Sequence, residues 1–263
     1  MLDTLLKKLN KMKVSVIIPC YNFEDYIEQS ILSVVSQKTN FEFEILVRDD
    51  MSNDNSQICI ERVANFNSNV RYFNAEENLG ACNNIKFLIE QCKGEYIAWL
   101  DGDDYWTDIY KLQKQVDFLD QNPEYIMTFT GYWMKKEKDY SPSLPYQWLC
   151  LPNNFSDGEV KTEDLLSGNW ISFGKFFRNG QNIIEDWMGE TTYLDWAMNY
   201  KLSKSGKIKY LDFPSGVYRV HDKGAFSLLK DEEKQKMTNI FIDKISIDYK
   251  NWKMDKKIIF NND

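Results

Sequence analysis

Three acidic side chains directly follow an apolar run near the middle of the chain. Residues 96–100 read YIAWL, and Asp101, Gly102, Asp103 and Asp104 come next. Because the side chains of an extended segment alternate, Asp101 and Asp103 are expected on one side, where Gly102 lets a ligand approach the backbone. Two such carboxylates suit Mg²⁺ or Mn²⁺, which complete their shells with water and phosphate oxygens. The alternative is a solvated acidic turn, since short D-x-D matches occur by chance.

Two further polar clusters follow strand-like apolar runs in the first half of the chain. One cluster reads PCYN at 19–22, and the other reads DDMSND at 49–54. In an open parallel sheet, ligands bind outside the carboxyl ends of the strands, so all three clusters are expected to meet. Tyr21 could stack on a nucleobase while Asp50 accepts an imide N–H. A simpler role is open for Asp54, as a helix cap.

The elements that must position these residues follow from hydrophobic periodicity. Over the first 130 residues, short apolar runs that predict strands alternate with segments of helical period. This alternation indicates right-handed βαβ units and a largely parallel sheet. Strands are expected at 14–18, 43–47, 70–73, 95–100 and 125–130, and helices at 24–37, 54–66, 81–92 and 107–119.

The second half of the chain has a different character. Residues 135–158 hold three of the six prolines and predict a long surface loop. Beyond it we expect helices at 161–166 and 191–205, an extended segment at 170–177, and strands at 208–211 and 217–220. The charged tail from Leu228 places Phe241, Ile245, Tyr249 and Trp252 at helical spacing. This stripe predicts a helix packed on the body, with dimer contact or membrane-surface attachment as alternatives.

Composition limits the classes of function. The 263 residues are 43% hydrophobic and carry a net charge of −8, which disfavours nucleic acid as a partner. The apolar runs are far shorter than the roughly 20 residues that span a bilayer. The first 13 residues lack the apolar core of a signal peptide. We therefore expect a cytoplasmic location, with peripheral contact at the inner face of the membrane as an alternative.

The cysteines and the histidine narrow the chemistry further. The five cysteines form no C-x-x-C pair, and His221 is the single histidine of the chain. A structural zinc site and a Ser-His-Asp hydrolase are therefore disfavoured. The chemistry must depend mainly on carboxylates.

Five motifs, in this order and spacing, resemble the inverting glycosyltransferases of family 2. They are VSVIIPCYN at 14–22, EILVRDDMSNDNS at 44–56, NLG at 78–80, GEYIAWLDGDDYW at 94–106 and GKIKYLDFPSGVYRVH at 206–221. The resemblance implies an α/β fold of the GT-A type, with a Rossmann-like, mostly parallel central sheet flanked by helices and a C-terminal helical tail. It implies one catalytic domain at 1–225, with a nucleotide-sugar-binding half at 13–122 and an acceptor-binding half at 123–225, followed by an extension at 226–263.

The same resemblance suggests roles for individual residues. It implies that Asp50 contacts the base with Tyr21 beside it, and that Lys86 stands where many relatives carry an arginine. The complete donor-binding set is Pro19, Tyr21, Asn22, Asp50, Lys86, Asp101, Gly102 and Arg219. The implied metal ligands are Asp101, Asp103 and His221, which ends the closing motif; a histidine alone is more often a surface residue. Arg219 would pair with phosphate or with a site carboxylate.

The resemblance also places a catalytic aspartate just before or on the helix that precedes the GKI segment. Asp195 matches this position, although many relatives read Glu-Asp where this chain reads Leu-Asp. Glu190 and Asp186 remain rival bases. Alternatively, Asp195 is a first-turn carboxylate that the helix dipole favours.

These residues and the family resemblance together imply a metal-dependent transferase that uses Mn²⁺ or Mg²⁺. It would move a sugar from a nucleoside-diphosphate donor, with UDP favoured by Asp50, to a hydroxyl of a glycan or lipid-linked saccharide in surface polysaccharide synthesis. Trp148, Trp170 and Trp187 are candidates for stacking on acceptor sugars. The main alternative is a nucleotide-sugar or glycan-binding module without catalysis. A nucleotidyltransferase is disfavoured because the chain lacks a basic Gly-rich phosphate loop.

Overall fold

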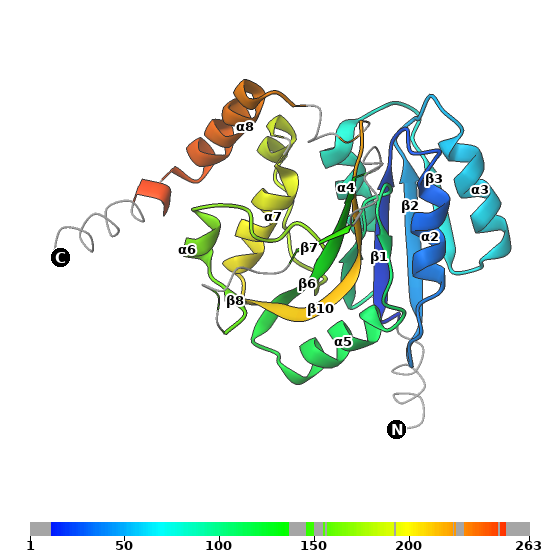
Figure 1. The fold of residues 1–263 in the computed structure, drawn as a ribbon, viewed down its shortest axis with the longest axis horizontal. Helices are drawn as coiled ribbons and strands as arrows, with labels where there is room; N and C mark the ends of the chain where they lie inside the picture. Colours follow the sequence, from blue (N-terminus) through cyan, green and yellow to red (C-terminus); the bar gives the residue numbers. More distant parts are fainter. Residues whose placement is uncertain are drawn as a thin grey trace.

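The computed structural model describes residues 12–136, 146–149, 155, 157–191, 193–222, 224, 229–246 and 248–250. Within these described residues, ten strands form one mixed sheet with helices against both faces (Figure 1). Its main path runs in the order β3-β2-β1-β4-β9-β6-β10-β5. The predicted α/β architecture, a central sheet flanked by helices, is confirmed.

The first half of the sheet is parallel, as the alternation predicts. Its strands are β1 (Val14–Cys20), β2 (Phe43–Asp49), β3 (Val70–Asn74) and β4 (Tyr96–Trp99). β1 lies between β2 and β4, and β2 pairs with β3. The connecting helices are α2 (Ile27–Val35), α3 (Ser56–Phe66) and α4 (Gly80–Gln91).

The second half adds antiparallel strands to this sheet. β9 (Phe176–Arg178) lies antiparallel between β4 and β6 (Tyr125–Lys136), and β6 pairs in parallel with β10 (Lys207–Val220). Three short antiparallel strands complete the sheet: β5 (Tyr105–Trp106), β7 (Tyr146–Leu149) and β8 (Glu159–Val160). The parallel character expected from the sequence therefore holds for β1 to β4 and for the β6–β10 pair.

Two sequence expectations need correction here. The segment 135–158 is not a loop throughout, because β6 continues to Lys136 and β7 pairs with it. The strands expected at 208–211 and 217–220 are one strand, β10, whose register with β6 shifts around Pro214. Proline lacks the amide that a continuous ladder requires, so the chain bends there without leaving the sheet.

The two faces of the sheet carry separate hydrophobic cores. One core gathers buried residues of α2, α3 and α5 (Lys111–Gln121), and the other those of α4, α6 (Thr162–Leu165), α7 (Leu194–Ser203) and α8 (Asp231–Lys244). Alternation along β1 sends Ile17 to one core and Val16 and Ile18 to the other. A short 3-10 helix, η1 (Asp186–Glu190), precedes α7.

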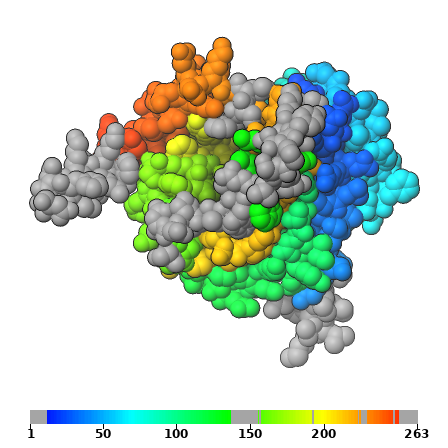
Figure 2. Space-filling model, viewed as in Figure 1, coloured from blue at the N-terminus to red at the C-terminus, as the bar shows by residue number. Residues whose placement is uncertain are grey.

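The C-terminal tail packs on the body, as its apolar stripe predicts. Phe241 of α8 is fully buried, with its ring centroid 4.5 Å from that of Trp196, and Ile245 is also buried. In Figure 2, α8 is the orange ridge beside the yellow and green second half, opposite the blue first half. Trp252 lies outside the described residues. In the described part of the chain, no helix combines the length and apolarity needed to span a membrane.

Candidate active site

Hydrogen bonds join the carboxyl ends of β1, β2 and β4. The Asp50 amide donates to the Cys20 carbonyl at 2.9 Å, and the Leu100 amide donates to the Ile17 carbonyl at 3.1 Å. A Cβ on Gly102 would lie 2.7 Å from the Pro19 carbonyl oxygen. The prediction that the three polar clusters meet is therefore confirmed. The glycine at 102 permits one strand end to approach another, and its role toward a donor stays a prediction.

The three aspartates after β4 have three different partners. Asp101 Oδ1 accepts from Trp99 Nε1 at 2.9 Å, and Asp103 Oδ2 lies 3.1 Å from His221 Nε2. Asp104 Oδ1 accepts from the Arg219 amide at 2.8 Å. The D-x-D turn is thus tied both to β4 and to the end of β10.

Burial dominates the electrostatics of this turn. It raises the pKa of Asp101, an effect that the Lys175 ammonium opposes and the Asp103 carboxylate reinforces. Burial, together with Asp103 and Asp101, raises the pKa of Asp104 well above its usual range. Clustered carboxylates that are this poorly solvated favour a nearby cation. Among the described residues, however, no group of three or more His, Cys, Asp or Glu side chains is arranged to hold a metal.

His221 and Arg219 support the turn from β10. The buried His221 ring lies 4.6 Å from the Tyr26 ring and 6.1 Å from the Phe23 ring, measured between centroids. The Arg219 guanidinium donates to the Asp103 carbonyl and to Gln29 Oε1, and its carbon lies 5.0 Å from the Tyr26 ring centroid. Arg219 therefore contacts the main chain of the turn, and contact with a donor phosphate stays a prediction.

The predicted base-binding residues lie around the ends of β1 and β2. Asp50 is 2% exposed, and its carboxylate accepts from the amides of Leu79 at 3.1 Å and Gly80 at 2.8 Å. These bonds fix the start of α4 beside β2. Tyr21 is 41% exposed, which leaves its ring open to a stacking partner. Asn22, the next residue of this turn, adopts the left-handed backbone conformation, with a φ of 60°.

The PCYN and DDMSND segments are bonded to each other and to α3. Asn22 Oδ1 accepts from the Asn53 amide at 2.8 Å. Asp54 accepts from the amide and hydroxyl of Ser56, the first residue of α3, but the N-cap position itself is Asn55, one residue later than the capping alternative predicts. The Ser52 amide donates to Asp49 at 2.9 Å. Asn22 and Asp54 therefore act at least as structural residues of these turns.

Asp195 lies in the first turn of α7, near the D-x-D turn. Its Oδ2 accepts from Asn169 Nδ2 at 2.8 Å and lies 3.9 Å from Lys175 Nζ. Lys175 in turn lies 4.8 Å from the centroid of the Trp99 ring, whose indole N–H donates to Asp101. The structure therefore links Asp195 to the first aspartate of the D-x-D motif.

The rival bases have different surroundings. Glu190 and Asp186 are exposed on η1, with ion-pair partners Lys244 of α8 at 3.4 Å and Lys86 of α4 at 3.5 Å. Lys86 thus lies against η1 through Asp186, and its proposed donor contact stays a prediction. Of the three acidic candidates, Asp195 is the one with a described link to Asp101.

Sequence reasoning missed Lys175 and Asn169. Lys175 is buried immediately before β9, in the segment ISFGKFF at 171–177. A lone lysine inside an apolar run was the signal that could have found it, because an ammonium is rarely buried without a partner. For Asn169, no comparable signal was present.

Two of the three aromatic acceptor candidates have hydrogen-bond partners inside the protein. Trp170 Nε1 donates to the Asp164 carbonyl at 3.0 Å, and Trp187 Nε1 donates to Glu185 at 2.6 Å. Trp148 lies opposite Trp133 in the β6–β7 pair. Stacking of these rings on an acceptor stays a prediction.

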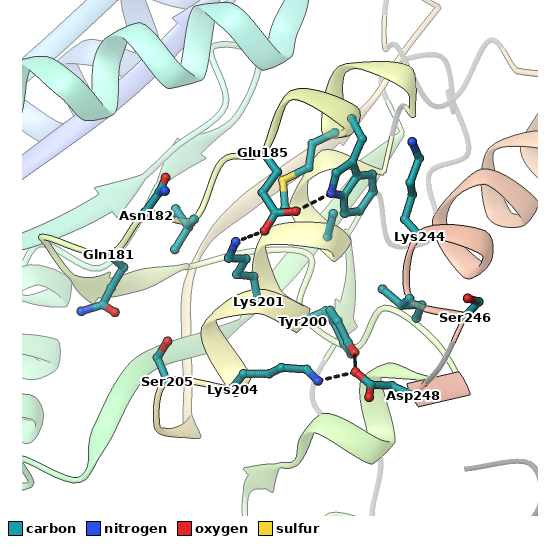
Figure 3. A pocket seen from close by; sticks show the side chains of 15 residues that line it. Gln181, Asn182, Glu185, Tyr200, Lys201, Lys204, Ser205, Lys244, Ser246 and Asp248 are labelled. Atoms are coloured by element: carbon teal, nitrogen blue, oxygen red, sulfur yellow. Dashed lines mark hydrogen bonds and ion pairs between the residues drawn. The ribbon is translucent and has the colours of Figure 1, made fainter. Parts of the chain in front are cut away.

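A pocket of about 530 Å³ lies away from these carboxylates, beside α7 and the end of α8 (Figure 3). Its ion pairs join Lys201 to Glu185 and Lys204 to Asp248. Trp187, an acceptor candidate, lines it, but none of the predicted catalytic, donor-binding or metal-binding residues does. The candidate active site is therefore defined by the convergence of carboxylates at the sheet edge.

A protein-family model described as Glycosyl transferase family 2 matches residues 15–182. The chain belongs to glycosyl transferase family 2. The matched segment ends before Asp195, Arg219 and His221. The family match therefore does not cover these three residues, and the evidence that they lie near the D-x-D turn comes from the tertiary structure.

Solved structures share the fold of this glycosyl transferase family 2 chain. S. aureus TarS 1–349, in complex with UDP-GlcNAc, has a TM-score of 0.65 at 21% identity, covering 87% of this chain and 65% of that chain. The mannosyltransferase PcManGT from Pyrobaculum calidifontis, in complex with GDP-Man and Mn²⁺, has a TM-score of 0.61 at 17% identity. The match covers 89% of this chain and 64% of that chain. The predicted GT-A fold is confirmed.

Curated relatives are also similar to this chain in sequence. An uncharacterized protein of Mycobacterium tuberculosis is 29% identical over 214 residues, which are 80% of this chain and 60% of the relative. The putative teichuronic acid biosynthesis glycosyltransferase TuaG of Bacillus subtilis is 35% identical over 122 residues, 46% of this chain and 47% of the relative. The family 2 chain thus spans about half to three fifths of the length of these relatives.

Proposed function

We propose that this family 2 chain transfers a sugar from a nucleoside-diphosphate sugar to an acceptor hydroxyl, with inversion at the anomeric carbon. The observation that carries the proposal is the link from Asp195 through Lys175 to the D-x-D turn. It joins a candidate base to candidate metal ligands across two halves of the chain. A binding module without catalysis would not require that link.

Asp101, Asp103 and His221 are the residues that would hold Mn²⁺ or Mg²⁺. Poor solvation of the clustered aspartates supports this assignment, as does the 3.1 Å approach of His221 Nε2 to Asp103 Oδ2. The scarcity of protein ligands also fits, because Mg²⁺ sites commonly use one or two carboxylates together with phosphate oxygens and water. When bound, the cation would neutralise charge on the departing diphosphate.

Asp195 is the general base of the proposed reaction. Its side chain is 29% exposed, so an acceptor hydroxyl can reach it, while Asn169 holds one carboxylate oxygen. Asp195 takes the proton from the acceptor hydroxyl as its oxygen attacks the anomeric carbon. The bond from that carbon to the diphosphate breaks on the opposite side, and the nucleoside diphosphate leaves. One displacement of this kind inverts the configuration.

The donor and acceptor classes are supported by the relatives. The TarS structure is a complex with UDP-GlcNAc and the Pyrobaculum structure a complex with GDP-Man and Mn²⁺, so a nucleotide sugar is the expected donor. We favour UDP because Asp50 and the exposed Tyr21 follow two strands whose ends are hydrogen-bonded to each other. The similarity to TuaG supports a saccharide acceptor in surface polysaccharide synthesis. We retain a glycan or lipid-linked saccharide as the acceptor class.

A donor panel tests the proposal. UDP-GlcNAc, UDP-glucose and GDP-mannose are tested for thermal stabilisation and for release of nucleoside diphosphate, with Mn²⁺ or with chelator. We expect a UDP-sugar to stabilise the protein. We expect it to be turned over in the presence of Mn²⁺ but not in the presence of chelator. Stabilisation without turnover would instead favour the binding module, and pyrophosphate as product would indicate nucleotidyl transfer.

Two variants then assign the roles. Asp103→Ala should abolish the Mn²⁺-dependent stabilisation, because a principal metal ligand is lost. Asp195→Asn should bind the donor within about threefold of the wild type but lose about 10²- to 10⁴-fold in turnover, the usual contribution of a general base. Full turnover by Asp195→Asn would remove Asp195 from the mechanism and return Glu190 and Asp186 as candidates.

A further inference from the structure

Lys175 is a buried cation at the junction of the two halves of the chain. Its side chain is 5% exposed, and the flanking residues Phe173, Phe176 and Phe177 are buried in the core. Burying an ammonium is costly unless compensating partners are present. The position of Lys175 therefore has to be explained by what surrounds its Nζ atom.

Three groups surround that atom. The Ser172 carbonyl accepts from Lys175 Nζ at 3.0 Å, the Trp99 ring centroid lies 4.8 Å away, and Asp195 Oδ2 lies 3.9 Å away. The backbone is fixed as well, because the Lys175 carbonyl accepts from the Trp99 amide at 3.1 Å. The ammonium is held by β4 and by its own turn, and it points to the start of α7.

Asp195 is held from its other side by an amide whose orientation is fixed. Asn169 Nδ2 donates to Asp195 Oδ2 at 2.8 Å, while Asn169 Oδ1 accepts from Asn199 Nδ2 at 3.2 Å. Asn199 Nδ2 also donates to the Ile171 carbonyl at 3.0 Å. With Asn169 fixed in this way, Lys175 supplies the positive charge next to the Asp195 carboxylate.

We propose that Lys175 is a positioning residue for the transfer, acting through Asp195. Its ammonium aims the Asp195 carboxylate and offsets the repulsion between that carboxylate and Asp101, whose Oδ1 is bonded to the same Trp99 side chain. Without the charge, the Asn169 side-chain amide and the Trp196 main-chain amide are the remaining described groups that hold the Asp195 carboxylate, which is then aimed less precisely at the D-x-D turn. The inference rests on the proposed function, in which Asp195 is the base.

The kinetic test compares a neutral variant with a charged one. Lys175→Gln keeps a donor for the Ser172 carbonyl but has no charge, and Lys175→Arg keeps the charge. With the nucleotide sugar from the panel that stabilises the protein most, and Mn²⁺, we expect Lys175→Gln to lower kcat about 10- to 100-fold, a loss typical of a misplaced catalytic group. Its KM should stay within about threefold. Lys175→Arg should lose less than about threefold in kcat.

Lys114→Met is the matched control for these variants. Lys114 also contacts a carboxylate, Asp108, and an aromatic ring, Phe213, but on the exposed side of α5. Its kcat should equal that of the wild type. Equal kcat values for Lys175→Gln and the wild type would overturn the inference, as would equal losses in Lys175→Gln and Lys175→Arg.

A second measurement does not depend on activity. Lys175→Gln and Asp195→Asn remove the same contact, so their shifts in melting temperature should not add in the double variant. Additive shifts would overturn the contact even if the enzyme is active. Absence of turnover by the wild type with every donor would instead overturn the proposed function.

Discussion

Lys111 carries a second buried ammonium, and its removal should stabilise the protein. It begins α5 with no exposed surface, donates from Nζ to Gln115 Oε1 at 2.5 Å and lies 4.2 Å from the Trp106 ring centroid. Burial lowers the pKa of Lys111 from 10.5 to about 7, and Asp108 opposes this shift. Gln115 in turn donates to the Gly174 carbonyl at 2.9 Å, next to Lys175.

The sign of the effect on stability follows from linkage. The unfolded chain binds the Lys111 proton more tightly than the folded chain does, so the free energy of unfolding rises with pH between about 7 and 10.5. Below about pH 7 the folded state carries the whole penalty, which is about 5 kcal/mol at 1.36 kcal/mol per pH unit. At pH 10 about 1 kcal/mol of it remains.

Lys111→Met removes the penalty but leaves Gln115 Oε1 without its Lys111 donor, at a cost of about 1–3 kcal/mol. We therefore expect the variant to be more stable than the wild type by about 2–4 kcal/mol at pH 6, and equally or less stable at pH 10. Urea unfolding followed by tryptophan fluorescence at intervals from pH 6 to pH 10 measures the difference.

Lys114→Met, an exposed lysine on the same helix, is the control, and its difference from the wild type should show no comparable rise toward low pH. The reasoning is refuted if Lys111→Met is less stable than the wild type at pH 6. A difference that stays constant across the pH range would refute it equally.

Two further substitutions test the packing around the site. Phe241→Ala should lower the free energy of unfolding by about 3 kcal/mol, because it empties the position where α8 packs on Trp196. Phe66→Ala, at an exposed position, is the control and should have little effect. A loss below about 1 kcal/mol for Phe241→Ala in urea unfolding would contradict this packing. Gly102→Ala should destabilise by about 1–3 kcal/mol and weaken UDP binding with Mn²⁺ in calorimetry, because its Cβ would lie 2.7 Å from the Pro19 carbonyl. Gly168→Ala, whose Cβ would meet other atoms at 3.6 Å, is the control, and equal behaviour of the two variants would contradict the close approach.

The strands of the first half and the acidic turn could be predicted because their signals are local. Alternating apolar runs define β1 to β4, and the polar residues that follow each run must lie at strand ends. In parallel strands these ends share one edge, so the order of the runs alone predicts that Pro19, Asp50 and Asp101 converge. The apolar stripe of the tail likewise predicted that Phe241 packs on the body.

The second half was predicted less well because pairing between distant segments decides it. β9 has three residues and no local signal for its place, yet it lies between β4 and β6, with Tyr96 opposite Arg178 and Met127 opposite Phe177. That placement sets Lys175 beside Trp99 at the end of the sheet.

The sequence by itself determined which residue types stand at the strand ends and hence that carboxylates gather at one edge of a parallel sheet. Only the tertiary structure decided which partners those carboxylates have: Lys175 beside Asp195, His221 beside Asp103 and the Arg219 amide on Asp104. The physical reason is the separation along the chain over which each effect acts. Hydrophobic periodicity is a property of neighbouring residues, whereas the neutralisation of buried charge depends on which remote segments the sheet brings into contact.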